Sequence, residues 1–430
     1  MRKGDWGSAT LGDLCSDVTS GATPQSGNSR YYREGAGTLF AKIEDLTAAN
    51  GSYLDETTLR VTKAALRESA LKVYPPGTIL ISMYGTVGLV KIARYSISAN
   101  QALAALIPPF KCHEKFLYHY LNWSRGDWGK YKAQTTQANI NGAIVKRRVI
   151  NLPTANEQRR IAEILDTLDQ AISSLRLSAN KYAQIRLAHV RDLMAEGLRV
   201  LQSFEASELG SLESRGRGPW VLAPLGRALI KIEAGNSPSV EDTPAGPGEW
   251  GVLKVSAIGR NGFRPEENKV ARDRSLQIKE LCVRSGDLLI TRANTAELVG
   301  MACIVDETPP GLMLCDKTLR LRVDDDFSSR EYVHLILAIA EVRRQIEIAA
   351  TGTSGSMKNI SQASIRRLMI PWSDRERMDH VVRIDAGYAA QVNALMRKAR
   401  HLTLLKQGLM EDLLTGRVRV AEAETVLENL

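Results

Sequence analysis

Residues 161–187, IAEILDTLDQAISSLRLSANKYAQIRL, decide the fold class of this chain. After Ile161 the apolar positions of this stretch alternate in steps of four and three, at Leu165, Leu168, Ile172, Leu175, Ala179, Tyr182 and Ile185. Such steps place the side chains on one stripe of a helix, and their persistence over several heptads predicts a coiled-coil seam. The stripe therefore predicts one long amphipathic helix.

The same stripe recurs about 220 residues later in the chain. Its apolar positions are Val381, Tyr388, Val392, Leu395, Ala399, Leu402 and Leu405. Both stripes end on two consecutive steps of three, which breaks the alternation at the same place. This shared irregularity indicates common ancestry of the two helices. Gly197 and Gly416 follow the stripes and are expected near the helix C-caps. A helix of about 40 residues is about 60 Å long, and two packed antiparallel would hold their globular domains at opposite ends.

Asp385 interrupts the second stripe, where the first has Leu165. A charge in a seam costs stability unless it specifies the register or finds a partner. The residue can instead lie at a frayed start of the second helix, and this is the interpretation that we favour from sequence.

A globular segment precedes each helix, and it too is repeated. Five residues of the first segment return 214 positions later: Trp6, Leu11, Gly12, Gly21 and Pro24 as Trp220, Leu225, Gly226, Gly235 and Pro238. The stretches TLFAKIEDL, PPGTILISMYGTVGLVKIA and ANQALAALIP predict strands, followed by a helix at about residues 114–128. WGVLKVSAI, VRSGDLLITRANTAELVGMACIV and the helical EYVHLILAIAEVRRQI replay this order in the second copy. Internal repeats of this kind dominate the prediction of a fold.

The predicted fold class is α+β, with two globular α+β domains separated by two long antiparallel coiled-coil helices and related by an internal pseudo-twofold repeat. The expected boundaries are residues 1–153 for the first domain, 154–200 for the central helix, 201–219 for a linker, 220–371 for the second domain, 372–420 for the C-terminal helix and 421–430 for a tail.

Composition narrows the class of protein. Hydrophobic residues make up 44% of the 430-residue chain and charged residues 24%, which is typical of globular domains. The apolar runs are too short to cross a bilayer and the N-terminal residues show no signal core, so a cytoplasmic protein without membrane contact is expected. Five scattered cysteines and six histidines form no metal-binding spacing, so no metal site is predicted. The net charge of +9 is consistent with a polyanionic partner.

Two sets of motifs carry a resemblance to a known family. NLPTANEQRRIAEILDTLDQAISSL in the first copy and LKQGLMEDLLTGRVRV in the second resemble the conserved regions of the specificity (S) subunits of type I restriction-modification systems. The openings LGDLCSDVTSGATP and LGRALIKIEAGNSP resemble the starts of that family's target-recognition domains. The resemblance covers nearly the whole chain, although IPWSDRERMDHV in the second copy lacks the Glu-Gln pair of TANEQRRIA.

The resemblance implies a subunit that reads a bipartite sequence of double-stranded DNA, one half-site per domain, with the helices setting the spacer. It implies docking of two methylation subunits on the helices and recruitment of restriction subunits. S-adenosylmethionine, ATP and Mg are then expected in those partners, with no cofactor in this chain. The candidate subunit contacts are Glu157, Gln158, Ile161, Leu165, Leu168, Ile172, Leu175, Val392, Leu395, Leu402, Leu405 and Leu409.

DNA contacts are expected among polar and basic residues in turns beside strand ends. Asn and Gln suit adenine, whereas Arg and Lys suit guanine or phosphate. The candidates are Lys42, Tyr84, Asn100, Gln101, Gln134, Thr135, Lys254, Arg292, Asn294, Lys317, Lys358 and Asn359, with two recurring basic clusters as phosphate clamps, Lys146, Arg147 and Arg148 in the first copy and Arg366 and Arg367 in the second.

Two alternatives remain open from sequence. An enzyme would need catalytic motifs, but the chain has no GxxxxGK[ST] for a nucleotide and no Asn/Asp-Pro-Pro-Tyr/Phe segment around a flipped base. A coiled-coil adaptor with two protein-binding globular heads fits the repeat and the helices equally well. Only the family resemblance and the positive charge favour a non-catalytic DNA-recognition subunit over the adaptor.

Overall fold

The computed structural model describes residues 6–33, 35–131, 139–202, 219–259, 262–352 and 357–420. The chain folds into two compact units, Met1–Ala179 with Asn393–Leu430 as unit 1, and Asn180–Val392 as unit 2. Each long helix contributes one part to each unit. Most of the expected linker and the whole expected tail lie outside the described residues.

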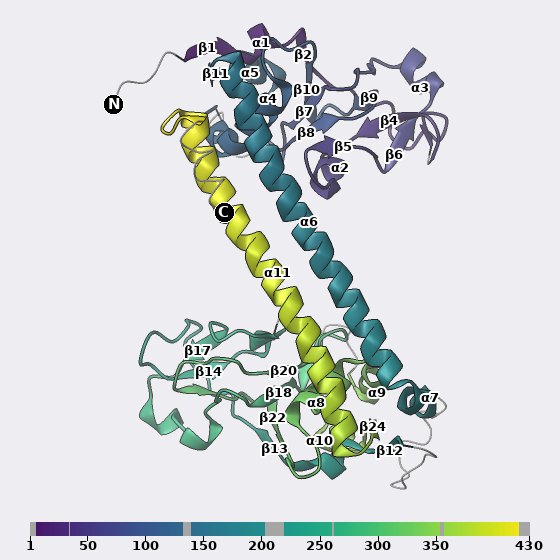
Figure 1. Cartoon of the computed structure of the whole chain (residues 1–430), viewed down its shortest axis with the longest axis vertical. Helices are drawn as coiled ribbons and strands as arrows, with labels where there is room; N and C mark the ends of the chain where they lie inside the picture. Colours follow the sequence, from purple (N-terminus) through teal and green to yellow (C-terminus); the bar gives the residue numbers. More distant parts are fainter. Residues whose placement is uncertain are drawn as a thin grey trace. The chain divides into compact units, whose positions relative to one another are not determined.

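Unit 1 contains two main sheets (Figure 1). The larger has the order β2 (Asp17–Ser20), β10 (Leu103–Ile107), β7 (Ile79–Ser82), β8 (Val90–Ala93) and β5 (Tyr53–Leu54). The smaller has the order β3 (Tyr32–Arg33), β6 (Leu59–Val61), β4 (Thr38–Ala41) and β9 (Ile97–Ala99). β7 and β8 are buried along their whole length, so even the polar Ser82 and Lys91 lie inside, and the Lys91 ammonium donates to the Ala49 carbonyl at 2.7 Å.

The remaining elements of unit 1 are short. β1 (Gly7–Thr10) pairs antiparallel with β11 (Val149–Leu152). The helices are α1 (Leu11–Leu14), α2 (Ile43–Ala48), α3 (Lys63–Glu68), α4 (Glu114–Trp123), the 3-10 segment η1 (Ser124–Tyr131) and α5 (Gly142–Arg147). α4 packs on β8, and its apolar face joins the same core as the start of the first long helix.

Unit 2 repeats this architecture. Its larger sheet has the order β13 (Leu229–Ala234), β22 (Thr318–Val323), β18 (Leu288–Thr291) and β20 (Ala302–Ile304). A three-stranded sheet has the order β17 (Asn268–Val270), β14 (Gly251–Leu253) and β21 (Leu312–Met313). Three strand pairs complete it: β12 (Val221–Pro224) with β24 (Met369–Trp372), β15 (Ile258–Gly259) with β16 (Gly262–Phe263), and β19 (Ala293–Asn294) with β23 (Lys358–Asn359).

The helices of unit 2 cover one part of this sheet. α8 (Arg330–Ala338) packs on β20, and α9 (Ala340–Ala349), α10 (Gln362–Arg367) and α7 (Ala195–Gln202) complete the set. Four 3-10 turns, η3 (Leu225–Ala228), η4 (Val255–Ala257), η5 (Arg274–Leu276) and η6 (Lys279–Leu281), connect the strands. The predicted helix EYVHLILAIAEVRRQI is therefore two helices, broken at Ile339, whose extended backbone ends α8 and caps α9.

The two long helices are α6 (Ala155–Leu193, 39 residues) and α11 (Arg375–Thr415, 41 residues), as the stripes predict. In unit 1 their segments run antiparallel, because Asp169 pairs with Lys406 while Glu157, earlier on α6, pairs with Arg419, later in the chain. The first stripe is buried at Leu165 but leaves Tyr182 37% and Ile185 43% exposed. The first stripe is thus buried or half-buried as far as Ala179 and partly exposed beyond it.

Three expectations about these helices are wrong. Asp385 is the eleventh residue of α11 and does not lie at a frayed end, and its carboxylate holds Arg186 in a bidentate ion pair with N···O distances of 2.5 and 2.7 Å. Gly197 is no C-cap: it lies within α7, where a Cβ would come 2.8 Å from Pro371 Cβ, so close packing explains the glycine. The central helix is also interrupted at Met194, between α6 and α7.

Two smaller differences concern unit 1. The helix expected at residues 114–128 ends as an α-helix at Trp123 and continues as a 3-10 segment, where Gly126 and Gly129 weaken the α-helix. The stretch TLFAKIEDL is a strand only up to Ala41, because Asp45 accepts a hydrogen bond from the Lys42 N–H and starts α2. Among the described residues, none of the helices is both long and apolar enough to cross a membrane.

Candidate nucleic-acid interface

Five of the residues that the sequence predicts as DNA contacts meet at one edge of the larger sheet of unit 2. The Arg292 N–H, directly after β18, donates to the Lys317 carbonyl, directly before β22, at 2.8 Å. The pairing of β19 with β23 sets Asn294 opposite Lys358, and Asn359 opposite Ala293. The structure therefore gathers side chains that are up to 67 positions apart in the chain (Arg292 to Asn359).

The side chains of this cluster are basic or amide and partly exposed. Lys317 is 40% exposed and lies 3.2 Å from Asp316, while Lys358 donates to the Gly352 carbonyl at 2.9 Å. Arg292 and Asn359 are exposed, and the Asn294 amide oxygen accepts from the Thr295 N–H at 2.8 Å. Cationic and amide donors on turns are the groups that contact phosphates and base edges.

Two backbone hydrogen bonds of this cluster, which we call the frame, recur in unit 1 with other side chains. The Met83 N–H, after β7, donates to the Ala102 carbonyl, before β10, at 2.8 Å, as Arg292 does to Lys317. The Ile140 N–H donates to the Met83 carbonyl at 3.1 Å, as Ile360 does to Arg292 at 2.9 Å. The same two backbone hydrogen bonds thus define the same place in both units.

Four predicted residues of unit 1 lie around this frame. Because β4 and β9 pair in parallel with Ala41 opposite Ala99, Lys42 and Asn100 follow neighbouring strands at the same sheet edge. Tyr84, 40% exposed, follows Met83, and Gln101 is exposed beside Asn100. The Asn100 amide oxygen accepts from the Ala102 N–H, so this side chain also shapes the turn. The predicted Gln134 and Thr135 lie outside the described residues.

Two hydroxyl residues at these sites were missed by the sequence reasoning. The Thr23 hydroxyl donates to the Gln101 amide oxygen in unit 1, and the Ser237 hydroxyl donates to the Asp316 carboxylate in unit 2. A signal for them exists in the sequence, because Thr23 and Ser237 are separated by the same 214 positions as the repeated glycines beside them.

The predicted phosphate clamps divide into exposed and buried residues. Lys146 and Arg147 are exposed at the end of α5. Arg148 is only 3% exposed, with its guanidinium 3.9 Å from the Trp128 ring centroid and donating to the Ser124 carbonyl at 2.9 Å. Its assignment as a DNA contact is wrong, because the side chain belongs to the core of unit 1.

In unit 2 the remaining basic candidates stay near the surface. Arg367 is exposed, and Arg366 is half-buried and donates to the Leu229 carbonyl at 3.0 Å. Lys254 precedes η4 and pairs with Asp242 at 2.7 Å, so its charge is partly neutralised within the unit. Of these three residues, Arg367 has an exposed side chain. Among the contacts of the described residues, it alone of the three forms no such bond to an acidic group or a carbonyl.

Half of the predicted subunit contacts are core residues. The structure buries Gln158, Ile161, Leu165, Leu168, Ile172 and Leu409 within unit 1. Gln158 accepts from the His113 N–H at 2.8 Å and donates to the Pro153 carbonyl at 2.9 Å, and Glu157 caps α6 through Thr154. These side chains stabilise the unit and offer little surface to another subunit. The half-buried Leu175, Val392, Leu395, Leu402 and Leu405 remain as candidates.

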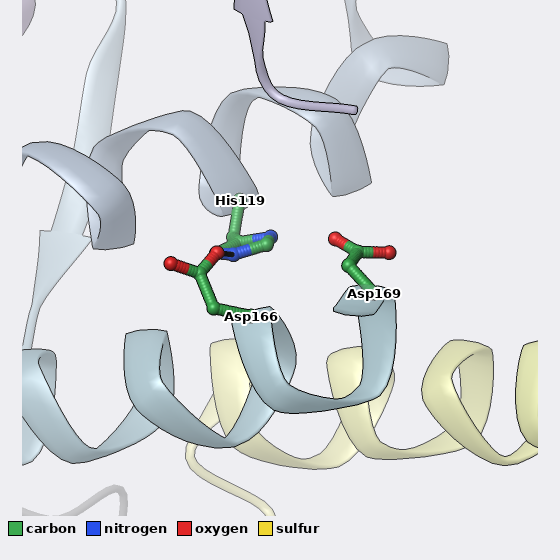
Figure 2. Close-up of side chains that lie close together, drawn as sticks. All are labelled: His119, Asp166 and Asp169. Atoms are coloured by element: carbon green, nitrogen blue, oxygen red, sulfur yellow. Dashed lines mark hydrogen bonds and ion pairs between the residues drawn. The ribbon is translucent and has the colours of Figure 1, made fainter. Parts of the chain in front are cut away.

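A cluster of titratable side chains joins α4 to α6 in unit 1 (Figure 2). His119, Asp166 and Asp169 can each offer one ligand atom, all within 4.8 Å of one another. Both carboxylates, however, already face an ammonium group: Lys115 lies 3.4 Å from Asp166, and Lys406 lies 2.6 Å from Asp169. A cation would have to displace these lysines, so we interpret the cluster as a charge network.

The electrostatics of this network follow from burial. His119 is fully buried, and its Nε2 lies 2.7 Å from an Asp166 oxygen. Burial lowers the pKa of His119 and outweighs the hydrogen bond to Asp166, which acts in the opposite direction. Burial would raise the pKa of Asp166, but the hydrogen bond with His119 and the charge of Lys115 hold it below its ordinary value. The network therefore consists of a neutral imidazole beside an ionised carboxylate.

Comparison with known proteins shows which proteins the chain is similar to. Residues 3–185 match the family model described as the type I restriction modification DNA specificity domain. The specificity subunit of the type I restriction enzyme EcoEI from Escherichia coli is 34% identical over 149 residues, which cover 34% of this chain and 25% of that subunit. The MjaIX specificity subunit of Methanocaldococcus jannaschii is 24% identical over 243 residues, 55% of this chain and 54% of the subunit. The chain thus aligns with a quarter to about half the length of these relatives.

A solved structure extends the shared fold to both units. The type I restriction-modification S subunit from M. genitalium superposes with a TM-score of 0.56 at 15% identity, covering 95% of this chain and 96% of that one. The predicted α+β fold class with long helices is thereby confirmed. The family match covers residues 3–185, and the resemblance of the chain to the specificity subunits is confirmed.

Proposed function

We propose that this chain is the DNA-specificity subunit of a type I restriction-modification complex and reads a bipartite target, one half-site per unit. The observation that carries the proposal is the repeated frame of two backbone hydrogen bonds, around which both units gather exposed amide and basic side chains. Turns beside strand ends that carry such donors can contact phosphates and base edges together. The family match over residues 3–185 supports this function for the first unit.

The same proposal assigns the chain no catalytic role. Methyl transfer, cleavage and the S-adenosylmethionine, ATP and Mg that they require would belong to partner subunits. The relatives are named as specificity subunits of restriction enzymes, which supports this division of labour. Double-stranded DNA, two methylation subunits and restriction subunits are therefore the proposed partners.

The long helices are the proposed docking surface for the methylation subunits. Exposed apolar side chains lie on both of them: Leu177 is 71% and Leu187 66% exposed on α6, and Met396 is 46% and Leu404 56% exposed on α11. Large apolar side chains in water favour burial against a partner. The similar lengths of α6 and α11 support two equivalent docking sites and a spacer set by the helices.

A domain exchange tests the function. Residues 219–373 are replaced by the corresponding segment of a relative with a different target, and methylated adenines are mapped in a genome that carries the complete system. This boundary keeps the β12–β24 pair and the hydrogen bond from the Ser373 hydroxyl to the Pro219 carbonyl within the exchanged segment. We expect one half-site to change, while the other half-site and the spacer stay the same.

A matched exchange of residues 6–152 is the control, and it should change the opposite half-site. A change in both half-sites, or in neither, would contradict the assignment of one half-site to each unit. An adaptor protein with protein-binding heads would give no sequence-specific methylation that depends on either segment.

A further inference from the structure

The shared frame makes one pair of side chains equivalent between the units. Ala102 and Lys317 occupy the same position, because each carbonyl accepts from the residue that follows the central strand, Met83 or Arg292. The residues directly before them, Gln101 and Asp316, are therefore structural counterparts. Both are exposed.

A second contact is shared at this position. Thr23 donates its hydroxyl hydrogen to Gln101, and Ser237 donates to Asp316. The loops that carry these hydroxyls press against the turns, since a Cβ on Gly21 would lie 2.2 Å from the Ala99 carbonyl oxygen. Gly235 is equally confined in unit 2, with 1.9 Å to the Leu314 carbonyl oxygen. The amide and the carboxylate thus each accept a hydrogen bond from a hydroxyl at the equivalent position of the repeat.

The chemistry at this position differs where the geometry is the same. Gln101 offers an amide with one donor and one acceptor side, whereas Asp316 offers only acceptors. The Asp316 carboxylate is 50% exposed and forms an ion pair with Lys317, whose Nζ lies 3.2 and 3.4 Å from its two oxygens, and it would repel a phosphate backbone. It is favourable at this position if it accepts hydrogen bonds from a base, as Asp does from the amino group of cytosine.

We propose that Gln101 and Asp316 are the same base-reading position in the two units, with Gln101 reading an adenine and Asp316 reading the N4 amino group of a cytosine. Thr23 and Ser237 are positioning residues that fix the orientation of these side chains before DNA binds. This inference rests on the proposed DNA-recognition function and specifies its chemistry at one position of each half-site.

The test selects binding sites from a library of random duplex DNA with the full chain, in complex with its methylation subunits, at one fixed salt concentration. The variants are Gln101→Glu and Asp316→Asn, which exchange amide and carboxylate without changing size. We expect Gln101→Glu to move one position of one half-site from adenine toward cytosine. Asp316→Asn should move one position of the other half-site from cytosine toward adenine, each by about tenfold or more in relative affinity.

The controls separate reading from general charge effects and from folding. Glu307→Gln removes the same charge from an exposed loop position of unit 2 and should leave the selected sequence unchanged. Ser237→Ala should weaken the preference at the Asp316 position only, and Ser237→Thr, which keeps the hydroxyl, should restore it. A denaturation midpoint equal to that of the parent chain confirms that each variant is folded.

Two results would overturn the inference in distinguishable ways. If Gln101→Glu and Asp316→Asn leave the selected sequence unchanged, or alter affinity for all sequences alike, these residues do not read bases. Bipartite selection by the parent chain would still support the proposed function in that case. If the parent chain itself selects no bipartite sequence, the proposed function fails as well.

Discussion

Arg147 and Arg148 are neighbours in a basic run, yet the structure places them in opposite environments. Arg148 is 3% exposed, lies over the Trp128 ring and bonds the Ser124 carbonyl, whereas Arg147 is exposed at the end of α5. We therefore predict that Arg148→Ala destabilises unit 1 without a direct effect on DNA affinity. Arg147→Ala should weaken DNA binding without an effect on stability.

The magnitudes follow from the contacts. A desolvated cation–π contact contributes about 2 kcal/mol, and a hydrogen bond from a charged donor about 1.5 kcal/mol or more. Because contributions from one side chain are not strictly additive, Arg148→Ala should lower the free energy of unfolding by about 2–4 kcal/mol. Arg148→Lys keeps the charge but loses the planar stacking, so we expect an intermediate loss. Arg147→Ala should stay within about 0.5 kcal/mol of the parent chain.

Two measurements on the full chain check these values. Urea denaturation followed by tryptophan fluorescence reports the loss of stability, since Trp128 lies against Arg148. Titration of DNA binding against salt reports the phosphate contact, and Arg147→Ala should reduce the slope of log K against log salt by about 1. The reasoning is refuted if Arg148→Ala unfolds at the same urea concentration as the parent chain, or if it reduces the salt slope as Arg147→Ala does.

Three further substitutions test individual interactions. Asp385→Asn removes the bidentate partner of Arg186, whose side chain is 32% exposed. The change should lower the free energy of unfolding by about 1 kcal/mol in thermal denaturation, whereas the same change at a frayed helix end would have no measurable effect. Arg320→Ala removes the buried guanidinium that pairs with Asp287 at 3.0 Å and with Glu233 at 2.6 Å, and leaves Asp287 paired with the 42% exposed Arg322. The change should cost about 3–5 kcal/mol in urea denaturation, and a loss below about 1 kcal/mol would contradict this. Burial lowers the pKa of His119 below 6.5, so the stability that the neutral ring contributes above this pH is lost as the pH falls from 6.5 through the folded-state pKa. His119→Gln should therefore flatten the pH dependence of the urea midpoint below about pH 6.5.

The helices are the part of the fold that the sequence predicts best, because helical periodicity is a local property. The apolar steps locate both α6 and α11, and a helix of either length needs no distant partner to be recognised. The role of Asp385 is not local in this sense. Its partner Arg186 is 199 positions away, so the plainer interpretation from sequence, a frayed helix start, is the wrong one.

The candidate site is predictable in its residue types but not in its assembly. Residues such as Arg292 and Lys358 are recognisable as polar or basic groups beside strand ends. That they meet depends on backbone hydrogen bonds between segments far apart in the chain, which carry no sequence signature. Arg148 shows the opposite error, since nothing in the run Lys-Arg-Arg indicates that the third residue, at the C-cap of α5, turns toward Trp128.

The repeated frame explains how the proposed reading residues can differ between the units. The frame of each site is made by backbone groups, such as the N–H of Met83 or Arg292, and these hydrogen bonds form whatever side chain the residue carries. Selection on the frame therefore acts on strand register and on the confined glycines, which are the same in both copies. Selection on the sequence that is read acts on exposed side chains such as Gln101 and Asp316, whose exchange costs the fold little because they are in contact with water. A target sequence can thus change by single substitutions at this position without a compensating change in the core.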